Sequence, residues 1–537
     1  MMIDKFLSCD VLVAGAGIAG LLCAKQALDQ GLSVIIVTND KFCSGASYFE
    51  LKASLGIQAT AGEQDKILFL EDISNRGKGV ENKELIDTYI HEIQENIHLL
   101  AEIGFNPWRR SDQRPACFAK YARDIYLISD WQNSKKRANE IFSQYSKLTI
   151  LEYSNLIHIV KKDDRVSGAI ISDGTDFIAI STPVVIGATG GIAGLYKDNL
   201  YPTKVRGSGH IVLMEAGATV QNIEFIQFIP AFVKPVYNVL FGEHTLKYCN
   251  GLYKDNTEIT WDKSKEELKA LLLERSSYAP FSFDFESHII DLAMIDGIDV
   301  IFDKSLYDDQ EEFYKIYLSW LKDKIGIDMC NDDIRIAPFA HSCNGGIKID
   351  NDAKTGILGL YAVGELSSAI EGANRLGGNS MGASLVFSKR AIQSIKNYLK
   401  DYSPRNDFDF IKRDFEKWLA PLLIKKTNED FSYEEIAQRL ENIISTAGNI
   451  IRNESVLTKS LAQIDAIKEY FYLRNNVHRG LDIYFRIEMI KMLLLAMLAR
   501  KESRGGHYRS DYPYTDSNVY KLMINRNKGS FIINKSL

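Results

Sequence analysis

A glycine-rich turn flanked by two apolar runs constrains the fold of this chain more than any other feature. Residues 11–14 form a short apolar run that is typical of a buried parallel strand. The motif Gly15-Ala16-Gly17-Ile18-Ala19-Gly20 follows at once, and leucine and alanine then recur at helical spacing as far as Gly31. Residues 34–37 form a second apolar run. Strand, GxGxxG motif, helix and strand in this order predict a βαβ unit that binds a dinucleotide.

Each glycine of the motif has a predicted role. Gly15 permits the tight turn, Gly17 lets a pyrophosphate approach the backbone, and Gly20 lets the helix pack closely on the strand. The first N–H groups of the helix then face the phosphates, supported by the helix dipole. The plainer alternative is a glycine-rich turn in an ordinary βαβ unit. NAD-binding units end the second strand with an acidic residue. Here Thr38 stands at that point and Asp40 comes later, so the motif does not specify which dinucleotide.

Composition limits the partners and the compartment. At 537 residues, more than one domain is expected. A net charge of −6 argues against nucleic acid as a partner. The seven cysteines lie far apart without a CxxC pair, which favours neither a metal site nor a redox dithiol and suits a reducing cytoplasm. We expect no signal peptide. The apolar run of about eleven residues from Met489 is too short to span a bilayer and predicts a buried helix.

Further glycine-rich segments follow strand-like runs later in the chain. Residues 183–191 read as a buried strand that ends in Ala-Thr-Gly-Gly, where backbone can approach a ligand closely. Residues 359–365 read as another strand, and residues 372–381 precede a helix. Residues 230–335 lack a βαβ rhythm, which predicts an insertion that splits one dinucleotide domain. From about residue 409 the pattern is helical almost to residue 504.

These pieces in this order resemble the flavoprotein subunit of succinate dehydrogenase and fumarate reductase, and the related L-aspartate oxidase. The resemblance covers nearly the whole chain. Its most specific matches are Gly359–Glu365, similar to GLYAxGE, Gly372–Met381, similar to GANRLGxNSL, and Glu502–Arg509, similar to ESRGAHYR. It implies an α/β fold with a Rossmann-like FAD-binding domain, an inserted α+β capping domain and a C-terminal helical domain. We expect the FAD-binding domain at 1–228 and 342–400, the capping domain at 229–341 and the helical domain at 401–537.

The resemblance also implies which residues contact FAD. The segment 44–47 lies where the family has its isoalloxazine loop, and Glu365 matches the glutamate that holds the FAD ribose. The predicted cofactor contacts are Gly15, Ala16, Gly17, Ile18, Ala19, Gly20, Thr38, Ser44, Gly45, Ala46, Ser47, Ala188, Thr189, Gly190, Gly191, Gly364, Glu365, Asn379, Ser380 and Met381. Some members attach the flavin to a histidine near this loop, but residues 41–62 contain none. The FAD is therefore expected to be non-covalent, and no metal is expected.

Two residues match substrate ligands of the family. His341 stands where the family has the histidine of HYTMGG, and Arg375 stands in GANRLG. The resemblance implies that both bind substrate carboxylates, and a guanidinium suits this role because it can bind both carboxylate oxygens. The plainer alternatives are a buried histidine with satisfied hydrogen bonds and an arginine in a structural ion pair.

Other positions depart from the family pattern. Ile229 stands where the family has a second histidine. Asp284 aligns with the arginine that donates a proton, and it is the third predicted catalytic residue; nearby Arg275 is a substitute candidate for the proton donor. For Asp284 an exposed loop carboxylate is an equally plain interpretation. His507 and Arg509 suit structural support of the flavin domain as well as substrate contact.

Two functions follow from these residues. The first is a cytoplasmic FAD-dependent oxidoreductase, of the fumarate reductase or L-aspartate oxidase type, that moves a hydride between FAD and a small carboxylate or amino acid. An amino acid is slightly favoured, because Asp284 would pair with an amine and repel a second carboxylate. The alternative is an electron-transferring or structural flavoprotein subunit of a larger complex, with an altered substrate site. The sequence has no iron–sulfur cysteine set and no membrane span, so a quinone or ferredoxin link would need a separate electron-transfer protein.

Overall fold

The computed structural model describes residues 3–309, 311–400, 402, 407–425, 431–474 and 476–537. At the centre of this part of the chain lies a parallel sheet with the strand order β20-β11-β2-β3-β7. Its strands are β2 (Val11–Ala14), β3 (Val34–Val37), β7 (Leu148–Leu151), β11 (Val185–Gly187) and β20 (Leu360–Ala362). Every residue of β2, β3, β11 and β20 is buried, which explains why these strands read as continuous apolar runs.

The central sheet joins two parts of the chain that are far apart in sequence. Leu360 of β20 lies opposite Val185 of β11, and Val185 also lies opposite Leu12 of β2. The glycine motif and the 359–365 segment therefore belong to one domain, with the insertion between them, as the sequence predicted. The residue numbers at which each domain begins and ends stay a prediction.

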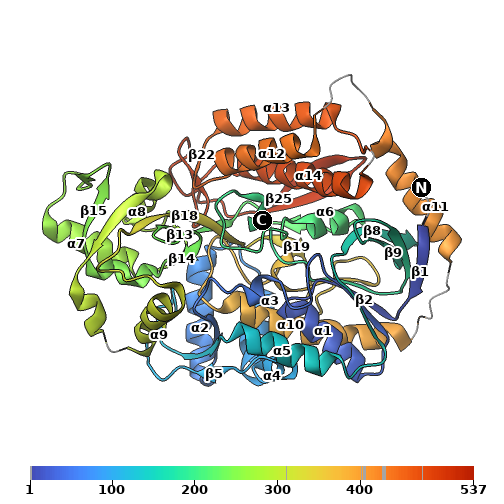
Figure 1. The fold of residues 1–537 in the computed structure, drawn as a ribbon, viewed down its shortest axis with the longest axis horizontal. Helices are drawn as coiled ribbons and strands as arrows, with labels where there is room; N and C mark the ends of the chain where they lie inside the picture. The colour runs from blue at the N-terminus through green and yellow to red at the C-terminus, as the bar shows by residue number, and fades with distance from the viewer. Residues whose placement is uncertain (1–2, 310, 401, 403–406, 426–430, 475) are drawn as a thin grey trace.

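Two helices that begin at the glycine-rich segments pack against each other beside this sheet. They are α1 (Ile18–Asp29) and α10 (Asn379–Lys400), which lie together in the lower half of Figure 1. The Ser388 hydroxyl of α10 donates a hydrogen bond to the Ala19 carbonyl of α1 at 3.2 Å. Helix α1 ends just before Gly31, whose φ of +80° suits glycine at a helix C-terminus.

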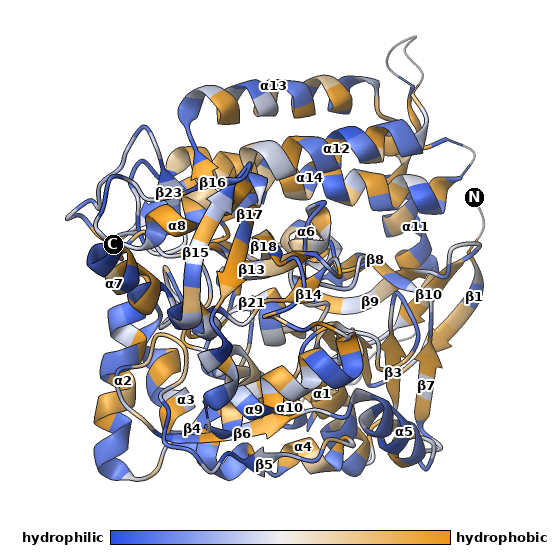
Figure 2. Ribbon diagram, turned by 60° about the vertical axis from the view of Figure 1, so that its left-hand side comes forward, coloured by the Kyte–Doolittle hydropathy of each residue, from blue (hydrophilic) through white to orange (hydrophobic). Residues whose placement is uncertain are grey.

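The remaining elements of this region form two smaller sheets and flanking helices. One sheet has the order β1-β10-β9-β8 and another the order β4-β6-β5. Their strands are β1 (Ile3–Ser8), β8 (Asn155–Lys162), β9 (Arg165–Ser172), β10 (Phe177–Ser181), β4 (Leu55–Ala59), β5 (Trp108–Arg109) and β6 (Asp124–Ile128). The helices are α2 (Glu63–Gly77), α3 (Lys83–Asn96), α4 (Leu99–Glu102), α5 (Trp131–Phe142) and α6 (Ser208–Glu215). Figure 2 shows strands β3, β7 and β10 as hydrophobic. Strands β3 and β10 are fully buried, whereas β7 lies at the edge of its sheet and is partly exposed.

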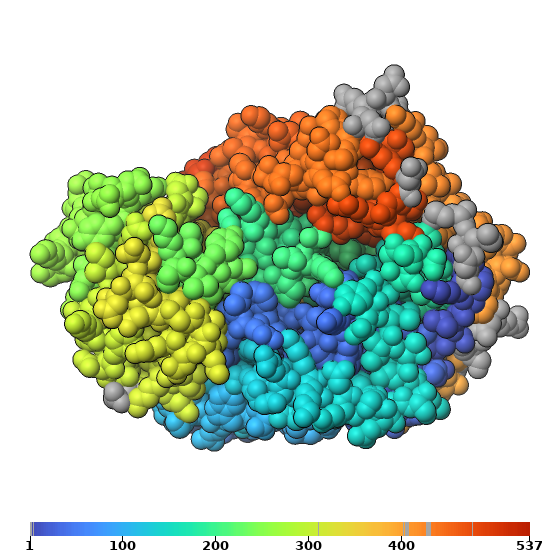
Figure 3. Space-filling model, in the orientation of Figure 1, coloured from blue at the N-terminus to red at the C-terminus, as the bar shows by residue number. Residues whose placement is uncertain are grey.

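The inserted segment forms a lobe with its own sheet, in the order β14-β13-β18-β17-β15-β16. Strands β13 (Ile226–Lys234) and β18 (Arg335–Cys343) carry the chain into and out of this lobe and pair antiparallel. The others are β14 (Val239–Leu240), β15 (Cys249–Lys254), β16 (Thr257–Glu258) and β17 (Ile298–Phe302), with helices α7 (Lys265–Arg275), α8 (His288–Ala293) and α9 (Glu312–Trp320). A separate hydrophobic core stabilises the lobe. It projects at the left in Figures 1 and 3, as the α+β capping domain predicted from the sequence.

The C-terminal part is helical only as far as Ala499. Helices α11 (Phe408–Leu419), α12 (Tyr433–Ala447), α13 (Glu454–Tyr470) and α14 (Val477–Ala499) lie along the upper side in Figure 1. The apolar run from Met489 lies within α14 and is largely buried, as predicted. Among the helices that the structure describes, none has the length and apolar character needed to cross a membrane.

The last residues, which lie in the predicted helical domain beyond the end of the helical pattern near residue 504, form a β-hairpin. Strands β24 (Lys521–Asn527) and β25 (Ser530–Ser536) extend the sheet β21-β19-β12-β24-β25, whose other strands are β12 (Val220–Gln221), β19 (Gly346–Lys348) and β21 (Ser367–Ser368). The period-2 pattern explains the difference, because Leu522 and Ile524 are buried and their neighbours are partly exposed. The C-terminus is thereby tied to the dinucleotide domain.

Candidate functional site

A cavity of about 370 Å³ lies where the central strands end and where α1 and α10 begin. Most of the predicted cofactor residues line it, namely Gly15, Ala16, Gly17, Ile18, Ala19, Thr38, Ser44, Gly45, Ala46, Ser47, Ala188, Thr189, Gly190, Gly364, Glu365, Ser380 and Met381. Three others, Gly20, Gly191 and Asn379, are next to lining residues in the chain but do not line the cavity themselves. Segments that are separate in sequence therefore meet at one site, which is typical of a dinucleotide-binding site.

The glycines of the first motif differ in what surrounds them. A Cβ added at Gly15, whose φ is +124°, would lie 2.1 Å from the Ala188 carbonyl oxygen, and one at Gly20 would lie 2.0 Å from the Gly15 carbonyl oxygen. Both positions therefore need glycine for close packing. At Gly17 the nearest atom would be the Ser47 hydroxyl oxygen at 3.4 Å. The space over Gly17 is open toward the cavity, which fits a pyrophosphate against the backbone.

The cavity wall carries features that suit a negatively charged cofactor. Residues at the starts of both α1 and α10 line it, and the N-terminus of a helix favours anionic groups. Beyond β3, Asp40 also lines the wall and pairs with Lys204 at 3.4 Å. Asp40, the acidic residue that comes after the end of the second strand, thus lines the same cavity. These observations are consistent with FAD at the site.

Glu365 is a carboxylate on the cavity wall, close to the predicted substrate residues. Its Oε1 accepts a hydrogen bond from the Cys343 backbone N–H at 3.0 Å, and its Oε2 accepts one from the Tyr201 hydroxyl. A Cβ at Gly191 would lie 2.0 Å from Oε1, so this glycine makes room for the carboxylate. Burial raises the pKa of Glu365 to about 7, and Lys52 and Arg375 partly oppose that rise.

His341 and Arg375, the two predicted substrate ligands, lie on the wall of the same cavity. They are joined through two other side chains. The His341 Nδ1 lies 3.1 Å from the Ser342 hydroxyl, which donates to the Gln227 carboxamide oxygen at 2.5 Å. That oxygen also accepts hydrogen bonds from Nε and Nη2 of Arg375, at 3.3 and 3.0 Å. Burial and the neighbouring cations hold the pKa of His341 well below its usual value, so the imidazole is neutral at pH 7.

Asp284 is not brought together with His341 and Arg375. It is not among the residues that line the cavity. Its carboxylate accepts a hydrogen bond from Ser282 at 3.2 Å and pairs with Lys78 at 3.7 Å. The loop turns away because the Phe283 N–H bonds to the Gly505 carbonyl oxygen at 2.8 Å. This position does not support the catalytic role expected from the sequence.

Arg275, the substitute candidate for the proton donor, is also occupied elsewhere. It is fully buried at the end of α7, and its Nε and Nη2 each lie 2.8 Å from the Asp291 carboxylate. Further N–H groups bond to the carbonyl oxygens of Tyr278 and Ala279. Arg275 therefore stabilises the capping domain through these contacts. It does not line the cavity.

The wall that the capping domain contributes is mostly apolar and aromatic. Apart from His341, its residues are Ile229, Leu240, Gly242, Glu243, His244, Ala279, Phe313, Ile316 and Tyr317. Within the described residues, this wall has no lysine or arginine. Glu243 is its one carboxylate, and the Cys117 thiol donates a hydrogen bond to it at 3.0 Å. The sequence pointed only to Ile229 among these residues, because the others lie in segments without a repeating pattern.

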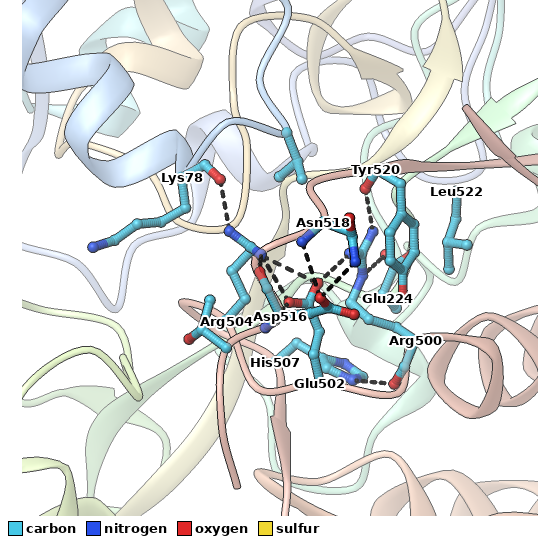
Figure 4. A network of polar contacts seen from close by, with 12 residues as sticks. Lys78, Glu224, Arg500, Glu502, Arg504, His507, Asp516, Asn518, Tyr520 and Leu522 are labelled. Carbon is cyan, nitrogen blue, oxygen red and sulfur yellow. Dashed lines mark hydrogen bonds and ion pairs between the residues drawn. The ribbon is translucent and has the colours of Figure 1, made fainter. Parts of the chain in front are cut away.

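The segment that resembles ESRGAHYR belongs to a network of polar contacts outside the cavity lining (Figure 4). Arg500 pairs with Glu224 at 2.6 Å and with Glu502 at 2.7 Å, all three fully buried. Arg504 pairs with Glu502 at 2.8 Å and donates to the Lys78 carbonyl oxygen at 2.9 Å. This network joins the C-terminal segment to the strand that leads to Gln227.

His507 and Arg509 belong to this network and do not line the cavity. His507 Nδ1 lies 2.6 Å from Nη1 of Arg452, and burial holds the pKa of His507 well below its usual value. Arg509 pairs with Asp511 at 2.8 Å. Of the two roles that the sequence allowed, their positions favour structural support. The Gly506 N–H in turn bonds to the Ala373 carbonyl oxygen at 2.9 Å, two residues before Arg375 in the chain.

Comparisons with known proteins agree with this geometry. Residues 10–242 and 282–381 match the family described as "FAD binding domain", and residues 437–530 match "Fumarate reductase flavoprotein C-term". An uncharacterized FAD-dependent oxidoreductase of Methanocaldococcus jannaschii is 28% identical, over 94% of each chain. L-aspartate oxidase of Clostridium perfringens is 30% identical over 73% of this chain and 87% of its own.

The solved structures extend the likeness to the fold of the whole chain. A chain of the E. coli quinol fumarate reductase superposes with a TM-score of 0.79 at 19% identity, covering 99% of this chain and 97% of its own. The cofactor is FAD. This chain therefore belongs to the family of FAD-dependent oxidoreductases that includes L-aspartate oxidase and the flavoprotein of fumarate reductase and succinate dehydrogenase.

Proposed function

We propose that this protein transfers a hydride between non-covalently bound FAD and a small carboxylate or amino acid. One observation carries the proposal: His341 and Arg375 line the same cavity as the glycine motif at residues 15–20. A substrate carboxylate at Arg375 would then lie beside the cofactor. Relatives named L-aspartate oxidase and fumarate reductase (CoM/CoB) support the same class of substrate.

The side chains around Arg375 have separable roles in this proposal. When bound, FAD supplies the group that accepts or donates the hydride. Arg375 binds the carboxylate, and Gln227 holds the guanidinium in one orientation through its two hydrogen bonds. His341 is neutral, and because the Ser342 hydroxyl donates to Gln227, the Nδ1–H of His341 donates to Ser342 and leaves Nε2 as an acceptor toward the substrate. Fixed anchors of this kind lower the entropic cost of reaching a reactive geometry.

An amino acid and a dicarboxylic acid are both candidate substrates. Asp284 lies outside the cavity and therefore gives no support for an amine. Glu243 is a buried carboxylate on the cavity wall, and it is able to pair with a substrate ammonium group. A second substrate carboxylate would instead meet this negative charge at close range.

A second function is favoured by the character of the capping wall. Because the described part of that wall has no lysine or arginine, the cap supplies no cationic proton donor. This suits a flavoprotein subunit with an altered substrate site, which passes electrons to a separate electron-transfer protein. Such a subunit would retain FAD and show no turnover of carboxylates.

Three measurements on the purified protein test the proposal. Acid or heat should release intact FAD, and flavin that stays on the denatured chain would contradict non-covalent binding. Small carboxylic acids and amino acids should then be screened, without oxygen, for reduction or reoxidation of the bound flavin. Arg375→Ala should abolish the response, whereas Arg109→Ala should leave it unchanged, because Arg109 pairs with Asp124 at 3.3 Å and does not line the cavity. A flavin that responds to no carboxylate would favour the second function.

A further inference from the structure

Lys52 is a buried lysine on the cavity wall that no sequence motif indicates. It is 4% exposed and lies in the loop between Tyr48 and β4. Its backbone is held at the joint between the domains, because the Trp131 indole N–H donates to the Lys52 carbonyl oxygen at 3.4 Å. The Leu240 N–H of the capping domain donates to the preceding carbonyl, that of Leu51, at 3.3 Å. The side chain therefore lies where the capping domain meets the dinucleotide domain.

The ammonium group of Lys52 has aromatic neighbours and no acceptor. Its Nζ lies 5.3 Å from the centre of the Tyr201 ring and 5.5 Å from that of Phe49. Among the described residues, none accepts a hydrogen bond from this Nζ or forms an ion pair with it. Its pKa is lowered to about 8, mainly by burial; Glu365 opposes this lowering and Arg375 adds to it. A lysine that is almost fully buried and whose Nζ has no acceptor among the described residues is costly, so its presence calls for an anion that the chain itself does not supply.

The carboxylate whose charge acts on Lys52 is already engaged. Glu365 attracts Lys52, but its two oxygens accept hydrogen bonds from the Tyr201 hydroxyl and the Cys343 N–H. Arg375, on the same part of the wall, also forms no ion pair within the described residues, and its partners are the neutral oxygens of Gln227 and Leu376. Two cations thus face one space, and neither has a carboxylate partner.

We propose that Lys52 and Arg375 together bind one carboxylate group of the substrate, with Lys52 as the second cation of that subsite. This inference rests on the proposed function. Both cations that bind the carboxylate then belong to the dinucleotide domain, because Lys52 and Arg375 lie outside the capping domain. The apolar wall of Ile229, Phe313 and Tyr317 is left to contact the remainder of the substrate.

The test compares carboxylate binding by matched variants of the FAD-loaded protein. Acetate, malonate and phenylacetate are titrated against the absorption spectrum of the bound flavin, and the tightest of the three is used throughout. Lys52→Met removes the charge and keeps a side chain of similar length. The control is Lys135→Met, because Lys135 pairs with Glu50 of the same loop at 2.9 Å and does not line the cavity.

Loss of one hydrogen bond between charged groups should weaken binding by roughly 10- to 100-fold in Lys52→Met, with FAD content unchanged. Lys135→Met should bind as the wild type does. In a second measurement, acetic anhydride labels the lysines and mass spectrometry follows each peptide. The bound carboxylate should protect Lys52 and leave Lys135 unprotected, a result that does not depend on turnover.

Other outcomes would overturn the inference in distinguishable ways. Equal affinity in Lys52→Met and the wild type, or no protection of Lys52, would show that Lys52 does not bind the carboxylate while the proposed function stands. Unchanged affinity together with a shifted flavin midpoint potential would mean that the ammonium faces the flavin. A wild-type protein that binds none of the three probes would remove the proposed function itself, and the inference with it.

Discussion

The carboxamide oxygen of Gln227 accepts two hydrogen bonds from the Arg375 guanidinium, from Nε at 3.3 Å and from Nη2 at 3.0 Å. The same oxygen accepts the Ser342 hydroxyl at 2.5 Å, so a single atom aligns the substrate-binding side chains. Gln227 is almost fully buried and belongs to β13, the strand that leads into the capping domain. The orientation of Arg375 therefore depends on the strand that joins the two domains.

Gln227→Leu should weaken carboxylate binding without loss of FAD. The leucine keeps the volume but removes the oxygen that orients Arg375, and a hydrogen bond to a charged group is worth ~1.5–3 kcal/mol. We expect a rise of roughly tenfold or more in the carboxylate Kd. Titration of the flavin spectrum measures this, and FAD content after desalting serves as the control. An unchanged Kd would mean that Arg375 is held by other contacts.

Gly17→Ala and Gly15→Ala should separate cofactor binding from folding. At Gly17 the backbone is extended and the new methyl group meets only Ser47, at 3.4 Å, so the protein should fold with an unchanged Tm. The methyl group occupies the space over the turn, and FAD affinity should fall at least about tenfold. Gly15→Ala should instead lower the stability of the apoprotein, because its φ is +124° and the methyl group would overlap the Ala188 carbonyl oxygen. Equal FAD affinity in Gly17→Ala and the wild type would contradict this placement of the cofactor.

Lys52→Met should stabilise the protein in the absence of a bound carboxylate. The pKa of Lys52 is lowered to about 8 from 10.5 by burial, with Arg375 and Glu365 as the charged groups that face it. Between these two pH values the unfolded chain binds a proton that the folded protein does not. The free energy of unfolding of the wild type therefore rises with pH there, and the penalty for a charged Lys52 is fully present below about pH 8.

At pH 7 the substitution should raise the free energy of unfolding by roughly 3 kcal/mol, at about 1.4 kcal/mol for each unit of pKa. The difference between the variant and the wild type should shrink as the pH rises from 8 toward 10.5. Urea unfolding at several pH values measures it. A difference that is constant with pH would show that Lys52 does not titrate in this range.

Gly505→Ala should disturb the segment that carries Arg375, whereas Gly529→Ala should not. Both glycines have positive φ, +52° and +81°. A methyl group at Gly505 would lie 2.5 Å from the Ala373 carbonyl oxygen, and one at Gly529, in the final hairpin turn, would meet nothing within 4 Å. Gly529→Ala should cost ~1 kcal/mol from backbone strain alone. Gly505→Ala should cost a further ~1–3 kcal/mol from overlap and should weaken carboxylate binding. Equal effects on stability and on Kd would argue against contact between the two segments.

The sequence predicted the cofactor half of the site more completely than the substrate half. The glycine motif combines apolar runs with glycines whose backbone demands are specific, whereas Glu365 and the 372–381 segment were identified by their resemblance to family motifs. Residues of all three line the cavity. The positions of β2, β3, β11 and β20 followed from their composition, because buried parallel strands read as continuous apolar runs. The hairpin at the end of the C-terminal domain was not predicted, since its alternation of buried and partly exposed residues is short.

Lys52 and Asp284 show why the substrate half was harder to predict. Both lie in loops without periodicity, where a charged residue is by default expected at the surface. Nothing local distinguishes Lys52, which faces the cavity because Trp131 and Leu240, distant in sequence, hold its loop. Asp284 was assigned by alignment, but contact with Gly505 fixes its loop elsewhere. The positions of both depend on tertiary contacts that a local pattern does not contain.

The order of strands in the central sheet has a consequence for protein synthesis. Strand β11 leaves the ribosome long before β20, its neighbour in the sheet, because the whole capping domain is made between them. Until then β11 has an unpaired edge, and the turn at Gly15 lacks the wall formed by Glu365 and Ser380. Gly505 and Gly506, which pack against Ala373, emerge later still. A nascent chain thus holds only a partial site until the segment that contains Gly505 and Gly506 has been made.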